Sequence, residues 1–273
     1  MRNKKNQKKP TLYGLHAVRE AWLNESRTIH TLYLTEQAQR GFEQTILEAR
    51  KNGLRRPDPQ IIEKHKLEKM LPRGAVHQGI ALSCTPAEEY DVQDFIIRSN
   101  TQDKTVLCIL DQVTDPHNVG AILRSASAFG ISGVIMQKKH APTLDGVLAK
   151  TACGAVDHIP VAQATNLSRT IKELQDEGFF VYGMDEHSNK EIGDVMKNQK
   201  HRPSNTTQKP TDICEPPDES TKIVIVLGSE GDGIRRLVKD GCDEMVKLPT
   251  QGAIASLNVS NAAAVAFYAL MCQ

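Results

Sequence analysis

Apolar and polar positions along the first third of the chain follow two periods, and together they predict a small α/β domain. Some segments repeat apolar residues every three or four positions, as in a helix with one buried face, and others alternate, as in a strand. The predicted elements are helices over 14–22 and 42–51 and strands over 29–34 and 77–84. Residues 54–60 (LRRPDPQ) are too rich in proline and polar groups to predict a strand.

The pattern changes from residue 105 onward, where short continuous apolar runs alternate with amphipathic segments. Such runs are typical of strands that are buried on both faces. Strands that alternate with helices predict a parallel sheet covered by helices on both sides. The predicted strands lie at 106–110, 134–136, 179–182, 223–227 and 245–248, and the predicted helices at 118–129, 167–177, 234–238 and 257–271.

Three segments follow neither period. Residues 1–10 are basic and polar and predict a disordered tail. Residues 85–104 predict an acidic, polar linker between a domain at 11–84 and a domain at 105–273. Residues 187–221 hold four prolines and almost no apolar periodicity, so they predict a disordered surface insertion without a binding role.

Charge is distributed unevenly along the chain, although the formal net charge is only +1. The first 73 residues carry 16 Lys and Arg against 8 Asp and Glu, and the remaining 200 carry 18 against 25. A basic end on an acidic body is typical of a protein that binds a polyanion, and equally of a solvated tail with ordinary surface lysines. Charge alone leaves both interpretations open.

Composition argues against several other classes of protein. Hydrophobic residues make up 39% of the chain, as in an ordinary globular protein, and no run of about 18 apolar residues predicts a membrane span. The basic N-terminus leads into no apolar stretch, so it does not resemble a secretory signal. None of the six cysteines stands in a CxxC spacing, which argues against a metal site and favours reduced thiols in a cytoplasmic protein.

Three segments directly follow predicted buried strands, which is where ligands bind in open parallel sheets. They are DQVTDPHNVGAILR at 111–124, LGSEGDG at 227–233 and LPTQGAIASLNVSN at 248–261. Each also has a plain structural explanation. The glycine-rich loop lacks the Lys-Ser/Thr of a Walker A loop and the GxGxxG of a dinucleotide fold. Asn118, Ser256 and Asn258 suit helix caps, and Arg124 suits an exposed surface.

Taken together and in order, these segments resemble the three motifs of the SpoU/TrmH branch of the SPOUT RNA methyltransferases. The resemblance lies in DPHNVGAILRSA, LGSEGDG and SLNVSNAAA. In the first domain, TLYGLHAVREA and GAVHQGIALS resemble the ribosomal-protein-like substrate-binding domain of the bacterial 23S rRNA guanosine-2′-O-methyltransferases, and TACGAVDHIPV at 151–161 also fits. The segments at 187–221 and 54–60 depart from the family pattern, but neither touches a motif.

The resemblance implies a fold and an activity. The fold would be a small α/β substrate-binding domain followed by an α/β SPOUT domain, with a parallel sheet, a trefoil knot and a homodimeric assembly. The activity would be the transfer of a methyl group from S-adenosylmethionine to a ribose 2′-hydroxyl of RNA, with a guanosine of 23S rRNA as the expected target. The basic first domain would then hold rRNA through its phosphates.

The resemblance also assigns roles to residues. Gly228, Gly252, Leu248 and Leu257 would hold the adenosyl group, and the missing Cβ at the two glycines would let the backbone approach it closely. Arg124 would grip a phosphate and stabilise developing alkoxide charge, because a guanidinium does not serve as a base. The remaining expected site residues are Asn118, Glu230, Ser256 and Asn258, with Glu230 and Asn258 assigned to positioning or proton handling.

Three alternative functions stay open beside this one. A tRNA 2′-O-methyltransferase of the same branch would carry the same motifs, although the GAVHQG-bearing first domain favours rRNA. A non-catalytic RNA-binding or ribosome-assembly factor would need none of Arg124, Glu230 and Asn258. A nucleotide-dependent oxidoreductase is disfavoured because no GxGxxG with a following acidic residue occurs.

Overall fold

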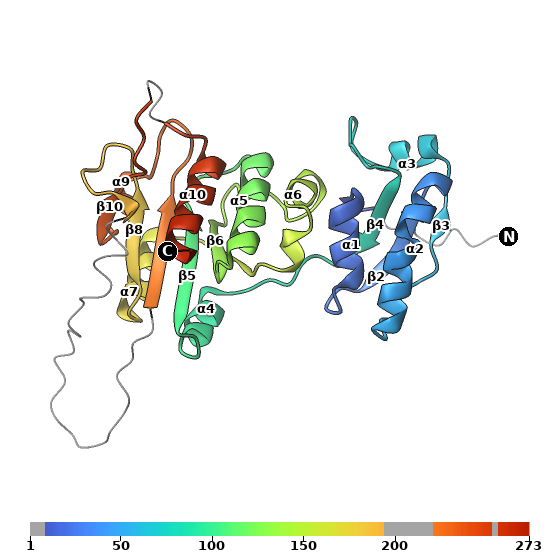
Figure 1. The fold of residues 1–273 in the computed structure, drawn as a ribbon, viewed down its shortest axis with the longest axis horizontal. Helices are drawn as coiled ribbons and strands as arrows, with labels where there is room; N and C mark the ends of the chain where they lie inside the picture. Colours follow the sequence, from blue (N-terminus) through green and yellow to red (C-terminus); the bar gives the residue numbers. More distant parts are fainter. Residues whose placement is uncertain (1–8, 194–220, 253–255, 273) are drawn as a thin grey trace, which may run out of the picture. The chain divides into compact units, whose positions relative to one another are not determined.

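The computed structural model describes residues 9–193, 221–252 and 256–272, and these form two compact units (Figure 1). The first unit takes its residues from Met1–Glu89, Thr114–Ser127 and Pro142–Pro160, and the second from Tyr90–Val113, Ala128–Ala141 and Val161–Gln273. Most of the predicted N-terminal tail and residues 194–220 of the predicted insertion lie outside the described residues. No helix in the described part of the chain is long and apolar enough to span a membrane.

A four-stranded sheet with the order β1-β4-β2-β3 organises the first unit. All four of its predicted elements are found, two of them within one residue of their expected ends. The second helix begins six residues earlier than predicted, and the last strand begins three residues later. The short strand β3 pairs in parallel with β2, and only its first residue falls within the segment for which no strand is expected. The elements are β1 (Leu12–Tyr13), α1 (Leu15–Leu23), β2 (Ile29–Leu34), α2 (Glu36–Lys51), β3 (Gln60–Ile61), α3 (Lys64–Met70) and β4 (Ile80–Cys84).

Large apolar side chains fill the space between this sheet and its helices. Trp22 of α1 and Phe42 of α2 are both buried and meet edge to face, with ring centroids 6.1 Å apart. Tyr33 of β2 and Leu67 of α3 pack in a second cluster. Helix α3 was not predicted. Only one of its seven residues, Leu67, is buried, so the helix has no apolar period that a sequence pattern could show.

Helix α5 (Pro116–Phe129) begins two residues earlier than predicted. Its N-terminal cap is Asp115 rather than Asn118. The side chain of Asp115 accepts a hydrogen bond from the His117 N–H at 2.9 Å, and its carbonyl oxygen accepts one from the Val119 N–H at 3.0 Å. Pro116 suits the first helical position because that position needs no N–H donor. The expectation that Asn118 is the N-cap is therefore wrong.

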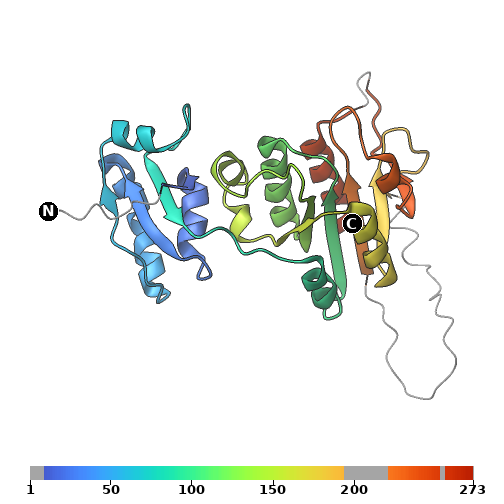
Figure 2. The ribbon, with the colours of Figure 1, turned by 180° about the vertical axis from the view of Figure 1, so that it is seen from behind.

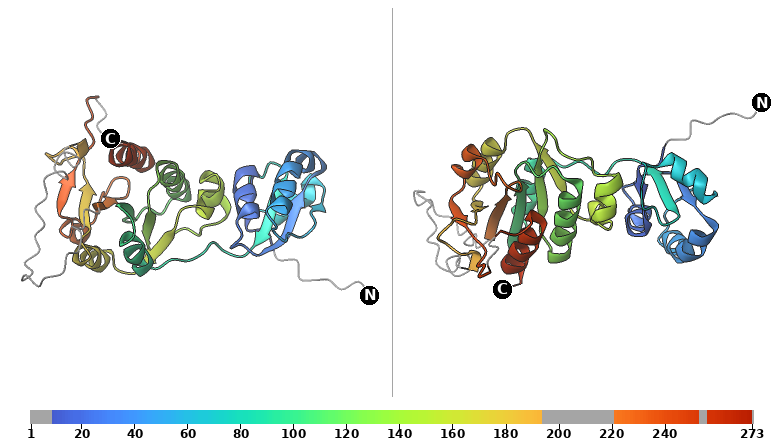
Figure 3. Two further views of the ribbon diagram at one scale, coloured as in Figure 1. Left: turned by 60° about the horizontal axis from the view of Figure 1, so that its bottom comes forward. Right: turned by 90° about the horizontal axis from the view of Figure 1, so that it is seen from above.

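A six-stranded parallel sheet with the order β10-β8-β9-β5-β6-β7 organises the second unit, as predicted for this half of the chain. Helix α10 (Val259–Met271) covers one face of the sheet (Figures 1 and 2). Helices α4 (Val92–Ser99) and α7 (Leu167–Asp176) cover the other (Figure 3). The strands are β5 (Lys104–Leu110), β6 (Gly133–Gln137), β7 (Val161–Ala164), β8 (Phe180–Met184), β9 (Thr221–Leu227) and β10 (Glu244–Val246).

The two central strands are apolar throughout because their side chains point alternately to the two faces of the sheet and both faces are covered. Leu107 and Ile109 of β5 pack in one cluster with residues of α4 and α7, and the residues between them point to the opposite face. Strand β9 runs in register with β5 over all seven of its residues, from Lys104↔Thr221 to Leu110↔Leu227. Strands β5 and β9, which are neighbours at the centre of the sheet and are covered on both faces, therefore form the core of the second unit.

Two segments that the sequence analysis assigns to a linker and an insertion contain ordered structure. Helix α4 lies within 85–104, and its Phe95 is 1% exposed and packs into the core of the second unit. Residues 187–193 run beside β10, where Ser188 Oγ donates to the carbonyl oxygen of Met245 at 2.6 Å and the Ile192 N–H donates to that of Lys247 at 2.9 Å. The pattern missed α4 because it has only eight residues, and it missed 187–193 because that segment is short and largely polar.

We predict that Phe95→Ala lowers the free energy of unfolding by about 3–5 kcal/mol, the range for removing a buried aromatic ring. Phe95 also contacts the backbone of β6, where a Cβ on Gly133 would lie 2.7 Å from its ring. Ile97, two residues along α4, is 65% exposed and serves as the control, because Ile97→Ala should change stability by less than about 0.5 kcal/mol. Urea unfolding measures both, and equal effects would mean that this segment is only a linker.

Candidate active site

A cleft of about 500 Å³ lies at the carboxyl edge of the six-stranded sheet, where the chain leaves three neighbouring strands. Loops that follow β8, β9 and β10 form its walls together with the start of α10. The carboxyl ends of parallel strands share one edge, so loops far apart in sequence meet there. The lining residues are 184–187, 227–234, Lys239, Lys247, Leu248, Thr250, Ser256, Leu257, Val259 and Ala262.

The glycine-rich loop after β9 closes on itself. Ser229 and Gly233 exchange two backbone hydrogen bonds, of 3.2 and 3.0 Å. A Cβ on Gly228 would lie 2.1 Å from the carbonyl carbon of Gly233 and 2.3 Å from the nitrogen of Ile234. Gly228 is therefore required by the backbone of its own loop. The reason expected from the sequence was different, namely the close approach of a ligand. A substitution at Gly228 would deform the loop whatever the loop binds.

An ion pair between the buried Asp111 carboxylate and the partly exposed Arg235 holds the far end of this loop. Asp111, the first residue after β5, has no exposed surface. Its carboxylate accepts hydrogen bonds from the Arg235 N–H and Nε, both at 2.8 Å, and Arg235 Nη2 lies 2.7 Å from Oδ1. The Asp111 N–H donates to the carbonyl oxygen of Leu227 at 2.8 Å. One residue thus binds both ends of the loop.

The structure brings two predicted site residues, Glu230 and Asn258, into direct contact. Asn258 Oδ1 caps α10 by accepting from the Ser260 N–H at 2.9 Å. That bond leaves the amide nitrogen to donate to Glu230 Oε1. The helix cap therefore also orients the donor that faces the Glu230 carboxylate.

The predicted site residues fall in three places. Gly228, Leu248 and Leu257 line the cleft, together with Glu230 and Ser256. Gly252 is exposed and is not among the residues that line the cleft. Asn258 is not among the lining residues but contacts Glu230 of the cleft. Arg124 and Asn118 lie on α5 in the first compact unit, where Arg124 is exposed and Asn118 is partly buried.

Asp185 is a carboxylate of the cleft that the motifs do not indicate. Asp185 follows β8 and accepts hydrogen bonds from Lys239 Nζ and, at 2.9 Å, from the His187 N–H. The bond from Lys239 and that from His187 hold the pKa of Asp185 below its ordinary value. The polar run DEHS at 185–188 directly follows β8 as observed, but it begins three residues after the end of the predicted strand at 179–182 and belongs to no recognised motif.

The first unit has a larger hollow, a groove of about 1110 Å³ between α1, α2, α3 and the turn before β4. His77 on its wall is 5% exposed, and burial lowers the pKa of its imidazole. Its Nδ1 accepts the Gly79 N–H at 3.0 Å, which places the ring proton on Nε2. The groove carries both Lys64 and Glu63 among its charged side chains, so its charge does not favour phosphate.

Comparison with known proteins divides the chain into two family domains. Residues 105–268 match the SpoU rRNA methylase family, and residues 11–90 match the domain described as RNA 2′-O ribose methyltransferase substrate binding. This chain belongs to the SpoU rRNA methylase family. The resemblance drawn from the three motifs is confirmed, and the chain is an RNA methyltransferase of the SpoU/TrmH type.

Relatives along nearly the whole length support this membership. The chain is 32% identical over 257 residues to a Bacillus subtilis protein provisionally named TrmH family tRNA/rRNA methyltransferase YacO, with 93% of this chain and 92% of that one covered. It is 35% identical over 260 residues to a Staphylococcus aureus protein of the same provisional family name, with 94% and 93% covered.

Solved structures support the predicted fold class. The SpoU methyltransferase AviRb from Streptomyces viridochromogenes, solved with AdoMet, superposes with a TM-score of 0.69 at 20% identity and covers 100% of this chain and 93% of its own. An AdoMet-bound rRNA methyltransferase from Sinorhizobium meliloti gives 0.67 at 20% identity over 95% and 85%. The α/β architecture with a parallel sheet is therefore confirmed, and the trefoil knot stays a prediction. No group of three or more His, Cys, Asp or Glu side chains in the described residues is arranged to hold a metal.

We predict that the adjacent arginines Arg235 and Arg236 differ sharply in their effect on stability. Arg235→Ala should lower the free energy of unfolding by about 3 kcal/mol, because it leaves the buried Asp111 carboxylate without its cation. Arg236 is 82% exposed and pairs with Asp240 at 3.5 Å. Arg236→Ala should therefore change stability by less than about 0.5 kcal/mol. Denaturant unfolding of the two variants gives the comparison, and similar losses would contradict the role given to Asp111.

Proposed function

We propose that this SpoU-family protein transfers a methyl group from S-adenosylmethionine to a ribose 2′-hydroxyl of RNA, with a guanosine of 23S rRNA as its target. The observation that carries the proposal is the cleft at the carboxyl edge of the sheet, where two of the three motifs meet. The substrate-binding match at 11–90 and the basic first 73 residues support RNA as the substrate.

The residues of the cleft fit the cofactor. A volume of about 500 Å³ lies within the range for small-ligand sites, which are lined by apolar groups with a few placed polar ones. Leu257 is 45% exposed and offers an apolar surface for the adenine, with Leu248 beside it in the lining. The Asp185 carboxylate is a suitable acceptor for ribose hydroxyls. S-adenosylmethionine supplies an activated methyl group on a sulfonium, so little covalent chemistry is left to the protein.

The protein then has to orient the ribose 2′-hydroxyl of the RNA and stabilise its oxygen as the proton leaves. Arg124 carries donors in a planar fork, which suits a phosphate and a developing alkoxide. Glu230 is the carboxylate suited to accept or relay the proton, and Asn258 holds it in place. Asn118 and Ser256 stay candidates for positioning the substrate. Orientation alone supplies much of the rate in such a reaction, so a strong base is not required.

Two further functions remain to be separated from this one by experiment. The relatives carry names that cover both tRNA and rRNA, so a tRNA target is the second candidate. A non-catalytic RNA-binding factor is the third, and the paired Glu230 and Asn258 in a ligand-sized cleft argue against it. The homodimer, the knot and the cytoplasmic location stay predictions from the resemblance.

The deciding experiment is a methyl-transfer assay with purified protein, labelled S-adenosylmethionine and separate pools of 23S rRNA and tRNA. Mapping of 2′-O-methyl groups then gives the nucleotide. Label in a single guanosine of 23S rRNA is the expected result. Label in tRNA alone would replace the target, and no transfer to either pool would support the non-catalytic alternative.

We predict that Leu257→Ala weakens the binding of S-adenosylhomocysteine by roughly tenfold, since about 1–2 kcal/mol of apolar contact with the adenine is lost. The leucine is already half exposed, so the stability of the protein should hardly change. Leu237→Ala is the matched control, because Leu237 is 64% exposed and does not line the cleft. Calorimetric titration of both variants measures the effect, and equal affinities would remove Leu257 from the site.

We predict that Arg124→Ala folds and binds S-adenosylhomocysteine normally but loses methyl transfer by on the order of a hundredfold, as the loss of one transition-state donor does elsewhere. Arg124→Lys should recover little, because an ammonium lacks the planar fork. Single-turnover rates on rRNA fragments give the comparison. A turnover close to wild type in Arg124→Ala would remove this arginine from the mechanism.

A further inference from the structure

The boundary between the two matched family domains does not coincide with the boundary between the compact units. Residues 142–160 lie within the SpoU methylase match, yet they belong to the same compact unit as the substrate-binding domain. That unit also contains residues 114–127, which form most of α5 and include Arg124. One compact unit therefore joins the substrate-binding fold to the helix of the candidate catalytic arginine.

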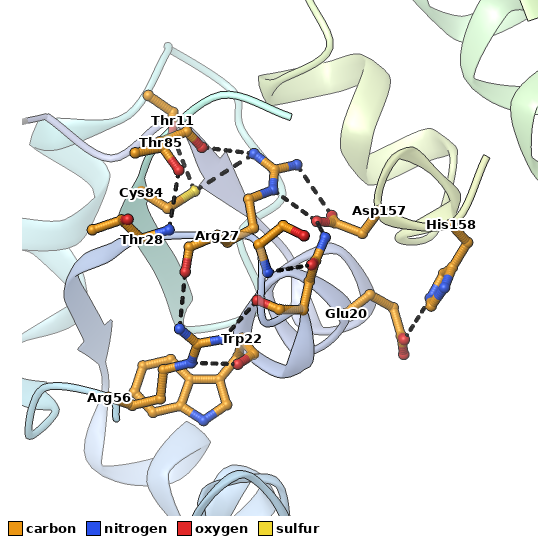
Figure 4. A network of polar contacts seen from close by, with 12 residues as sticks. Thr11, Glu20, Trp22, Arg27, Thr28, Arg56, Cys84, Thr85, Asp157 and His158 are labelled. Atoms are coloured by element: carbon orange, nitrogen blue, oxygen red, sulfur yellow. Dashed lines mark hydrogen bonds and ion pairs between the residues drawn. The ribbon is translucent and has the colours of Figure 1, made fainter. Parts of the chain in front are cut away.

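A buried ion pair lies at the centre of this junction (Figure 4). Arg27, in the turn after α1, donates from Nε to Asp157 Oδ1 at 2.7 Å and from Nη2 to Oδ2 at 3.2 Å. The two side chains are only 3% and 2% exposed. Arg27 Nη1 also donates to the carbonyl oxygen of Thr85 at 2.7 Å, and Asn24 Nδ2 donates to Asp157 Oδ1 at 2.9 Å. Both charges are thus paired and further hydrogen-bonded away from solvent.

A second arginine holds the turn that presents Arg27. The guanidinium of Arg56 donates to the carbonyl oxygens of Trp22, Asn24 and Arg27, at 2.8, 2.7 and 2.9 Å. These carbonyls lie at the end of α1 and just beyond it, where helical partners run out. Arg27 therefore meets Asp157 from a backbone that is already fixed.

Close packing surrounds the pair. Asp157 lies in the short helix η1 (Ala155–Asp157), which follows α6 (Gly146–Thr151). A Cβ on Gly154 would lie 2.3 Å from Cγ of Glu20 on α1, so only glycine fits this approach. Glu20 Oε2 lies 2.8 Å from His158 Nε2. The Gly146 N–H donates to the carbonyl oxygen of Thr11 at 2.9 Å.

The same segment packs against α5. A Cβ on Gly120 would lie 2.8 Å from the carbonyl oxygen of Leu148 and 2.8 Å from Cβ of Thr151, so α5 and α6 approach through their backbones. Arg124 is four residues beyond Gly120 and therefore lies one turn further along the same side of α5. An unbroken series of packed elements leads from Arg27 to Arg124.

We propose that Arg27 and Asp157 are positioning residues that hold the substrate-binding fold in one register against the helix of Arg124, so that bound RNA presents a single ribose. The proposal rests on the proposed function. Apolar burial is non-directional, whereas a bidentate arginine–carboxylate pair fixes direction and distance. Buried ion pairs contribute little net stability, and setting register is their best-attested role. A displacement of about 1 Å at a reacting group costs on the order of a hundredfold in rate.

The test replaces the pair by apolar residues of similar size, Arg27→Met with Asp157→Leu, because such replacement often preserves stability. We expect the double variant to melt close to wild type and to bind S-adenosylhomocysteine equally well. On long rRNA transcripts it should lose at least tenfold in methyl transfer rate, with RNA affinity within about threefold. Label should also spread from the mapped nucleotide to its neighbours, which a purely structural role would not produce.

The matched control is Arg50→Met with Asp58→Leu, an exposed pair of the same charges at 3.8 Å in the same domain. It should leave rate and target site unchanged. If the first double variant does not fold, Arg27→Lys replaces it, since lysine keeps the charge and loses the bidentate contact. Wild-type rate on the wild-type nucleotide in the folded variant overturns the proposal.

Hydrogen exchange separates this result from a failure of the proposed function, because it needs no activity. The amide of Gly146, bonded to Thr11 across the junction, should exchange at least tenfold faster in the double variant. Unchanged exchange overturns the proposal even if methyl transfer is reduced. Faster exchange in a protein that methylates no RNA supports the junction and rejects only the activity.

Discussion

The cleft depends on one charge, the buried carboxylate of Asp111. The loop at 228–234 leaves the sheet beside the Asp111 amide and returns at Arg235, which binds the Asp111 carboxylate through both backbone and guanidinium. A parallel sheet brings the ends of its strands to one edge but does not give the connecting loops a shape. Asp111 does so for the loop after β9, and that loop in turn places Glu230 opposite the start of α10.

The sequence predicts those elements whose own residues show a long enough apolar pattern. Strands β5 and β9 are continuous apolar runs because both faces are covered, and α10 is long enough to show its period. Helix α4 and strand β7 were missed, since eight and four residues carry too little local signal. Short elements are stabilised by tertiary packing, as Phe95 of α4 is by the core of the second unit, and a local pattern does not report this.

The candidate site was predictable for a related reason. Motif residues stand directly after buried strands, so finding the strands locates Gly228, Glu230 and Leu248 at one edge. Roles were harder to infer than places. Gly228 is glycine because the backbone of its own loop lies where a Cβ would be. Asp185 was missed because its importance comes from Lys239, 54 residues away in the chain, and spacing does not reveal such a partner.

The charges around the cleft suggest why cofactor and RNA would be attracted to different parts of the chain. Four acidic side chains and two lysines are among the lining residues: Asp185, Glu186, Glu230, Asp232, Lys239 and Lys247. An excess of carboxylates favours a sulfonium cation over its demethylated, uncharged thioether, so it would favour entry of the cofactor and release of the product. The same excess repels RNA phosphates. Attraction for RNA under the proposed function therefore has to come from elsewhere, and the first 73 residues, with twice as many basic as acidic groups, have the charge balance that suits a polyanion.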